Sequence, residues 1–149
     1  MVEDLRSPSI AALKTDLRDI LHHWREATGY GRGIAAPQVG VLKRIVLIDM
    51  GTPWLLVNPE IVEASRELME VYDACLSYLC IFFKVSRFKR IKMRYQDDNG
   101  EEKSVEAEDD LSELLQHEID HLEGVLAIDR VTNIKSICTR AEFERRYKR

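Results

Sequence analysis

Hydrophobic residues recur at helical spacing near the start of the chain. The members of this apolar stripe are Ile10, Leu13, Leu17, Ile20, Leu21 and Trp24. Their spacing of three or four residues is that of one face of an α-helix. Ser7 is suited to cap this helix, Pro8 is a favoured first residue, and Gly29 is suited to end it. We therefore predict an amphipathic helix between Ser7 and Gly29.

Short runs rich in β-branched and aromatic residues follow the predicted helix. They cover residues 44–49, 54–58, 68–72, 81–85 and 91–95. The last run alternates apolar and polar residues, which is typical of a half-buried strand. Pro53 and Pro59 flank the second run and indicate tight turns, and the sequence Asp98-Asn99-Gly100 suits a hairpin turn. These features predict short antiparallel strands.

A second helix is predicted at residues 109–122. Acidic residues at 108–110 suit its N-terminus, where the helix dipole favours negative charge. Together the elements predict an α+β fold, with short antiparallel strands packed around this central helix. The sequence has neither repeats nor a linker, so we expect one domain over residues 1–149.

Composition narrows the class of protein. The 22 basic and 26 acidic residues give a net charge of -4, which does not favour nucleic-acid binding. No apolar run is long enough to span a membrane, the N-terminus is unlike a signal peptide, and three cysteines do not make a disulfide framework. We expect a cytoplasmic protein without membrane or DNA contact. The basic tail, residues 134–149, is helix-compatible and fits either a solvated helix or a docking surface for an RNA-bearing partner.

The sequence His117-Glu118-Ile119-Asp120-His121 lies on the second predicted helix. Two histidines four residues apart share one helix face and can bind one metal ion, and the glutamate after the first histidine can act as a general base. Such a motif also occurs by coincidence. The adjacent His22 and His23 point about 100° apart on the first helix, so we interpret them as surface residues.

A catalytic metal site usually has a third protein ligand. The sequence contains no histidine after His121, and the later glutamates are poorly spaced for this role. Cys75 is the upstream candidate, since a thiolate binds soft metals well. A lone cysteine more often serves packing, so the residue by itself leaves both interpretations open.

Three segments considered together, in this order, resemble the motifs of the peptide deformylase family. Gly-x-Gly-apolar-Ala-Ala-x-Gln is matched at residues 31–38, Glu-Gly-Cys-Leu-Ser is matched in part at 73–77, and Gln-His-Glu-x-Asp-His is matched at 116–121. The similarity extends over about residues 31–130. The resemblance implies a metal-dependent hydrolase that removes the formyl group from formyl-methionyl peptides of nascent proteins.

The resemblance also implies roles for individual residues. The metal ligands would be Cys75, His117 and His121, holding one divalent ion. Ferrous iron is the implied metal, with zinc and nickel as replacements that the same donors accept. Glu118 would transfer the proton of the attacking water. The oxyanion donors would be the Gln38 amide and the Leu76 backbone N–H. Gly33 would lie where the substrate backbone pairs with the protein.

The chain departs from the family pattern in several places, among them Leu79 where the family has proline. Asp73 and Ala74 replace the usual Glu and Gly, although Arg87 is present as the expected ion-pair partner of the acidic residue. A further departure concerns the pocket for the first side chain, which is apolar in the family. The corresponding positions here are Arg32, Asp110, Glu113 and Leu114. The charged groups either turn outward or form an Arg32-centred cluster that polarises the pocket; we favour the cluster.

Three alternatives stand beside the deformylase interpretation. The first is a divergent hydrolase acting on another N-formyl or acyl amide. The second is a noncatalytic metal-binding homologue, which would need neither Glu118 nor Gln38. The third is a protease of the His-Glu-x-x-His type, which the missing downstream ligand disfavours. The expected partners are an N-formylated peptide and, through the basic C-terminal helix, the ribosome.

Overall fold

The computed structural model describes residues 1–2 and 4–148. Its first element, α1 (Pro8–Thr28), begins after Ser7 and ends at Gly29, whose φ of 75° is left-handed. The predicted helix is thereby confirmed at both ends. Leu17 and Leu21 are fully buried, whereas Ile20, another member of the apolar stripe, is 41% exposed. Ile20 lies at the margin of that stripe, where the helix turns toward solvent.

Two antiparallel sheets form the β part of the fold. A five-stranded sheet has the order β1-β2-β3-β6-β7 and a three-stranded sheet has the order β4-β5-β8. The strands of the first sheet are β1 (Gly33–Ala35), β2 (Ile45–Asp49), β3 (Pro53–Ala64), β6 (Arg90–Gln96) and β7 (Glu102–Glu108). Those of the second are β4 (Leu68–Cys75), β5 (Tyr78–Phe88) and β8 (Cys138–Thr139).

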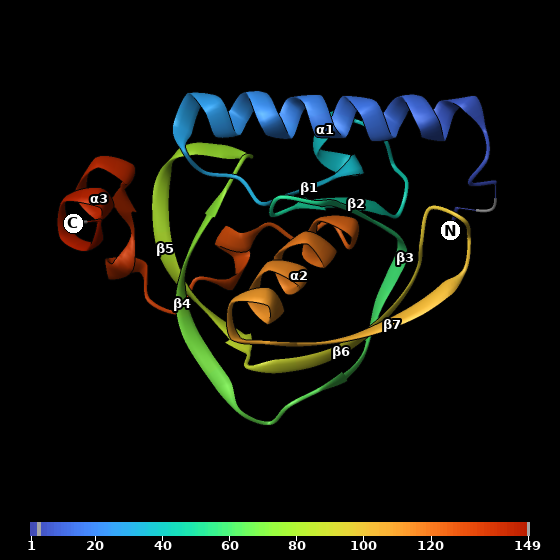
Figure 1. Cartoon of the computed structure of the whole chain (residues 1–149). Coiled ribbons are helices and arrows are strands. Elements are labelled where there is room, and N and C mark those ends of the chain that lie inside the picture. Colours follow the sequence, from blue (N-terminus) through green and yellow to red (C-terminus); the bar gives the residue numbers. More distant parts are fainter. Residues whose placement is uncertain (3, 149) are drawn as a thin grey trace.

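The central helix α2 (Asp109–Leu122) has the predicted bounds. In Figure 1 it lies in the middle of the molecule, with α1 on the far side of β1 and β2. Ile45 and Leu47 pack in the cluster with α1, while Val46 and Ile48 pack in the cluster with α2. Every residue of β2 is therefore buried, which explains why its sequence is a continuous apolar run rather than an alternating one.

Strand β3 corrects the predicted turn at Pro59. The strand continues to Ala64, and its pairing with β6 shifts register between Val57 and Glu60. Asn58 there has a φ of 50°, and its side chain bonds the backbone of Val2. Proline lacks a backbone N–H and is tolerated at such a bulge, so Pro59 marks an irregularity within a strand and not its end.

The C-terminal segment also differs from prediction. Instead of one helix over residues 134–149, it contains a 3₁₀ turn (Ile134–Ser136), β8, and the short α3 (Arg140–Tyr147). Pairing of Cys138 with Phe82 of β5 interrupts the helix. Arg149 lies outside the described residues. Figure 1 shows α3 beside β4 and β5, at the end of the molecule away from the N-terminus.

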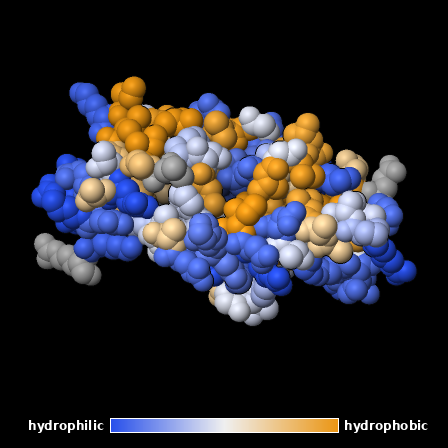
Figure 2. All heavy atoms as spheres, turned by 90° about the horizontal axis from the view of Figure 1, so that it is seen from above, coloured by the Kyte–Doolittle hydropathy of each residue, from blue (hydrophilic) through white to orange (hydrophobic). Residues whose placement is uncertain are grey.

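The surface combines hydrophilic and hydrophobic areas, as the view from above shows (Figure 2).

A buried acid lies under α1: the Asp49 carboxylate is 2.7 Å from Nε2 of His22. Asp49 also accepts a bond from the Gly51 backbone N–H. His22 is thus a surface residue, as predicted, but one that satisfies a buried carboxylate.

Candidate active site

Three metal-binding side chains converge where α2 faces the β4–β5 turn. His117 and His121 lie one helical turn apart on α2, and Cys75 is the last residue of β4. The Cys75 Sγ lies 3.2 Å from Nε2 of His121, which lies 3.2 Å from Nε2 of His117. All three side chains are buried. The helix therefore aims both histidines at a cysteine that is more than forty residues away in sequence.

The donor set fits a divalent metal ion. All three ligand atoms lie within 4.8 Å of one another. Donors of one tetrahedral ion with bonds of about 2.0–2.3 Å lie roughly 3.3–3.6 Å apart. One thiolate and two imidazoles also match the ligands that iron, zinc and nickel accept. Cys75, His117 and His121 thus form a coherent three-donor group.

The charges around Cys75 favour its thiolate. Burial is the largest single influence and raises the pKa of the Cys75 thiol, but the hydrogen bonds and the charges of His117 and His121 together outweigh burial and lower that pKa to about 6. For His117, burial is the largest single influence and lowers the pKa, but the hydrogen bonds to Asp73 and Cys75 and the negative charges of Asp73 and Glu118 together raise it well above the usual value. The Asp73 carboxylate lies 2.8 Å from Nδ1 of His117, leaving Nε2 toward Cys75 and His121.

A buried ion-pair network lies on the Nδ1 side of His117. The Arg87 guanidinium donates to Asp73 at 2.9 Å and to Asp120 at 2.5 Å. Arg130 donates to the same Asp120. The predicted pair of Asp73 with Arg87 is confirmed, so the shorter aspartate side chain still reaches its partner. This network fixes the ring of His117, as outer partners of metal-binding histidines commonly do.

Glu118 lies in a confined space beside the three donors. Burial raises the pKa of its carboxyl to about 7, despite the opposing charges of His117 and His121. Its Oε2 is buried without a hydrogen-bond partner among the described residues. A Cβ added to Gly33 would lie 2.6 Å from Glu118 Oε1, so only glycine leaves room for this carboxylate.

The opposite side of the donor group is polar. The Gln38 Oε1 accepts the Ala35 backbone N–H at 2.9 Å, which directs the amide Nε2 to within 3.6 Å of Cys75 Sγ and 3.3 Å of Ser77 Oγ. Leu76 follows Cys75 in the two-residue turn between β4 and β5. Gln38 therefore borders the donor group, and Leu76 follows one of its members in sequence; the role of both as oxyanion donors stays a prediction.

A cleft of about 300 Å³ opens beside these groups and is lined by Gly33, His117, Glu118 and Leu114. Arg32 and Glu113 line it as well, and their side chains pair at 2.8 Å. Arg32 also donates to Asp110 at 2.5 Å; Asp110 is outside the lining, and its side chain is 80% exposed. The predicted Arg32 cluster is present. Its effect on substrate choice stays a prediction.

Sequence reasoning missed an aromatic part of the same cleft. Its members come from separate elements and are Tyr30, Tyr72, Phe82 and Phe143. It also missed Arg130 as a partner of Asp120. Nothing in the spacing of these residues brings them together, because their proximity depends on how β4, β5 and α3 pack.

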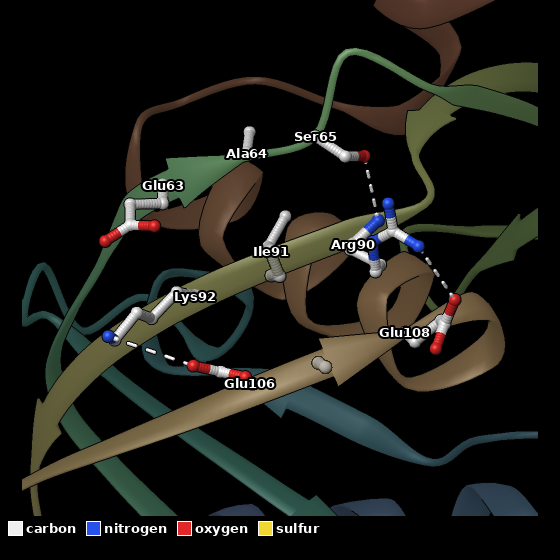
Figure 3. Close-up of a pocket in the computed structure, with 9 residues that line it drawn as sticks. Glu63, Ala64, Ser65, Arg90, Ile91, Lys92, Glu106 and Glu108 are labelled. Atoms are coloured by element: carbon white, nitrogen blue, oxygen red, sulfur yellow. Dashed lines mark hydrogen bonds and ion pairs between the residues drawn. The ribbon is translucent and has the colours of Figure 1, made fainter.

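A larger cavity lies elsewhere. It measures about 420 Å³ and is formed by the ends of β3, β6 and β7 (Figure 3). Its charged side chains are partly neutralised in pairs, with Arg90 at 3.5 Å from Glu108 and Lys92 at 3.8 Å from Glu106. Its lining contains no histidine or cysteine. We therefore assign the chemistry to the smaller cleft, where the donors and the buried carboxylate meet.

The combination of a buried Cys-His-His group and an adjacent glutamate defines a metallohydrolase centre. Residues 1–136 match the model of the polypeptide deformylase family. The peptide deformylase of Thermotoga neapolitana is 45% identical over 74% of this chain and 68% of its own length. A Synechococcus elongatus peptide deformylase solved in complex with actinonin has a TM-score of 0.83 and 31% identity, covering 91% of this chain and 71% of that one. The Thermotoga maritima peptide deformylase has a TM-score of 0.77 and 36% identity, covering 89% and 86% respectively.

The chain belongs to the polypeptide deformylase family. The family consists of metal-dependent hydrolases that act on formylated nascent peptides, and the chain is an enzyme of this type. The predicted family, α+β fold and deformylase activity are confirmed, and the alternatives of another amide substrate or a noncatalytic homologue are not favoured. Among the described residues, no helix is long and apolar enough to cross a membrane.

Proposed function

We propose that this enzyme hydrolyses the N-formyl group of formyl-methionyl peptides and releases formate through the cleft beside Cys75, His117 and His121. The observation that carries this proposal is the convergence of three metal donors with Glu118 and Gln38 on one cleft. Glu118 Oε2, buried and without a partner among the residues described, is poised to bond a group that the protein itself does not provide. A purely structural metal site would need neither of these two side chains.

Cys75, His117 and His121 would hold one divalent metal, which we propose to be ferrous iron, with zinc or nickel as replacements. A bound divalent metal would polarise the formyl oxygen and lower the pKa of water to about 7. The lowered pKa of Cys75 supports binding, because a thiolate and not a thiol is the ligand.

Glu118 would move the proton. We assign to its carboxylate the acceptance of a proton from the attacking water and the transfer of that proton to the departing amine nitrogen. The C–N bond then breaks to give formate and a free amino terminus. A carboxyl with a pKa of about 7 suits both steps at neutral pH, because it can accept and return a proton with little penalty.

Gln38 and the backbone N–H of Leu76 would stabilise the negative charge that develops on the formyl oxygen. Removing one such donor typically costs about 3–4 kcal/mol of transition-state stabilisation. The peptide would extend along β1, which is an edge strand of the five-stranded sheet and pairs on one side with β2. An extended peptide can pair with such an edge through backbone hydrogen bonds, and Gly33 lies there.

Formate release by protein prepared anaerobically with iron would test this function. Glu118→Gln should keep the metal and lower formate release by about 100- to 10,000-fold, because the proton acceptor is gone. The matched control is Glu123→Gln, an exposed carboxylate one residue beyond α2. Normal activity in Glu118→Gln would contradict the assignment.

The side chain of the first residue would contact Arg32, Glu113 and Leu114, with Asp110 behind Arg32. Burial, with the negative charge of Asp73, raises the pKa of the Glu113 carboxyl. The ion pair with Arg32 therefore gives the buried Glu113 carboxyl a partner. It also places charge on a wall of the pocket for the first side chain, which is apolar in the family. We expect kcat/KM to differ little among formyl-Met, formyl-Leu, formyl-Gln and formyl-Lys peptides. A strong preference for formyl-Met would refute the polar pocket.

The cellular location of the enzyme and its contact with the ribosome are also proposals. We propose a cytoplasmic enzyme that contacts the ribosome through exposed basic residues of the C-terminal segment, such as Arg145 and Lys148. Co-sedimentation with ribosomes at low and high salt would test this contact. Binding that persists after charge reversal at both positions would exclude it.

A further inference from the structure

An aromatic cluster joins α3 to the rest of the cleft. The Phe143 ring stacks on Phe82 of β5, with ring centres 4.3 Å apart and planes 10° apart. Tyr72 of β4 meets the Phe143 ring edge-on at 5.2 Å, and Tyr30, before β1, meets the Phe82 ring in the same way at 5.3 Å. Four elements thus contribute to one continuous aromatic surface.

This surface lines the same cleft as the catalytic groups. Tyr30, Tyr72, Phe82 and Phe143 border the space of about 300 Å³ that Gly33, His117 and Glu118 also border. Phe82 is only 6% exposed, whereas Phe143 is half-buried, so part of the Phe143 ring stays accessible. The cleft therefore has a charged wall at Arg32 and Glu113 and an aromatic wall that ends on α3.

Several contacts hold α3 in this position. Its N-cap, Thr139, accepts the Glu142 backbone N–H at 3.2 Å, and β8 pairs with β5 immediately before the helix. The Tyr30 hydroxyl donates to Glu144 at 3.0 Å, and the Lys148 ammonium lies 4.2 Å from the centre of the Tyr30 ring. The helix is therefore anchored to the cleft, although it lies beyond residues 1–136, the part that matches the family model.

We propose that α3 is a wall of the peptide-binding cleft and that Phe143 is a specificity-determining residue. Its ring would contact an apolar side chain of the peptide downstream of the formylated residue. This inference rests on the proposed function, which places the formyl carbon at the metal donors and the first side chain at Arg32. The part of the peptide that extends past these groups then meets aromatic rings, which bind apolar and aromatic side chains well.

Three substrates separate this role from general activity. They are formyl-methionine amide, which has no downstream side chain, formyl-Met-Gly-Ser, and formyl-Met-Leu-Phe. Phe143→Ala should lower kcat/KM for formyl-Met-Leu-Phe by about 5- to 10-fold, mainly through a higher KM. The change for the other two substrates should stay below about 2-fold. Phe143→Leu, which keeps an apolar contact and is more conservative for folding, should lie between wild type and Phe143→Ala.

Tyr147→Ala is the matched control. Tyr147 touches the Phe143 and Tyr72 rings but does not line the cleft, so its loss tests the cluster without removing the substrate contact. Equal losses on all three substrates, equal effects of the two alanine variants, or no loss in Phe143→Ala would each overturn the inference. If the wild-type protein were inactive even on formyl-methionine amide, the proposed function would be overturned. The inference about Phe143 would then fail as well.

Discussion

Among the described residues, two buried aspartates each contact a histidine, in different surroundings. Asp49 contacts Nε2 of His22 at 2.7 Å under α1, and Asp73 contacts Nδ1 of His117 at 2.8 Å beneath α2. Asp49 and Asp73 are both about 95% buried or more. The histidines differ, because the side chain of His22 is 48% exposed and that of His117 is 7% exposed.

The difference lies in what the second ring nitrogen meets. For His117 it meets Cys75 and His121, so the aspartate orients a ligand within a three-donor group. His22 is not part of such a group among the residues described, and its pair only satisfies a buried carboxylate. The same two types of side chain would thus support the proposed metal site in one place and satisfy a buried carboxylate in the other.

The largest expected effect follows loss of the thiolate. Cys75→Ser should reduce bound metal from about one per chain to a small fraction. Formate release should fall by more than the roughly 10- to 100-fold that is typical for loss of an outer partner. Elemental analysis and activity of purified protein would measure both. Cys80→Ser, at an exposed cysteine, should change neither; full metal content in Cys75→Ser would contradict the ligand assignment.

The two aspartates can be compared directly. Asp73→Asn should weaken metal affinity by about 10- to 100-fold, because a neutral amide orients the His117 ring less strongly than the charged carboxylate does. Asp49→Asn should leave metal affinity unchanged. Competition with a chelator would measure both variants under the same conditions. If the two variants lost affinity equally, the effect would come from global destabilisation and not from orientation of His117.

The charged wall of the cleft should have a more moderate effect. Replacing Arg32 and Glu113 together by leucine avoids leaving either charge buried and unpaired. We expect the ratio of kcat/KM for formyl-Met over formyl-Lys to rise about 10-fold, because an apolar wall favours the methionine side chain. Asp110→Asn is the control, since that side chain is largely exposed. An unchanged ratio in the double variant would show that this wall does not meet the first side chain.

The smallest effect concerns Asp49 and stability. The His22 hydrogen bond, followed by the Gly51 N–H, lowers the pKa of the Asp49 carboxyl. A lowered folded-state pKa gives stability that is present above the unfolded value of about 3.9 and is lost as pH falls through the folded value. Asp49→Asn should therefore cost about 1 kcal/mol at pH 7 and progressively less below about pH 4. Urea unfolding at several pH values would measure this, and a constant difference would contradict it.

Elements with strong local periodicity could be predicted from sequence. The bounds of α1 and α2 follow from apolar spacing and from residues that favour helix ends, although neither Ser7 nor Glu108 makes a side-chain capping bond. The donor group is predicted from the resemblance of the motifs to those of the family. The Arg32 cluster could be predicted because Glu113 and His117 lie one turn apart on a helix. The helix bounds depend on short-range geometry, whereas the donor group and the Arg32 cluster join distant segments and could be predicted only through the resemblance to the family.

Features set by tertiary packing could not be predicted. The bulge at Pro59 depends on pairing with β6, and α3 begins late because β8 first pairs with β5. Phe143 reaches the cleft only through that pairing. Contacts between distant segments of this kind leave no periodic pattern in the sequence.

The position of Gly33 restricts which substitutions the site can accept. Even a Cβ would lie 2.6 Å from Glu118 and 2.9 Å from the Ile48 side chain. Alanine would therefore contact the same two side chains as a larger residue. Tolerance at this position should therefore fall in a single step from glycine to every other residue rather than decline with size. Any replacement of this glycine would first have to displace Glu118, the proposed base, whatever the size of the new side chain.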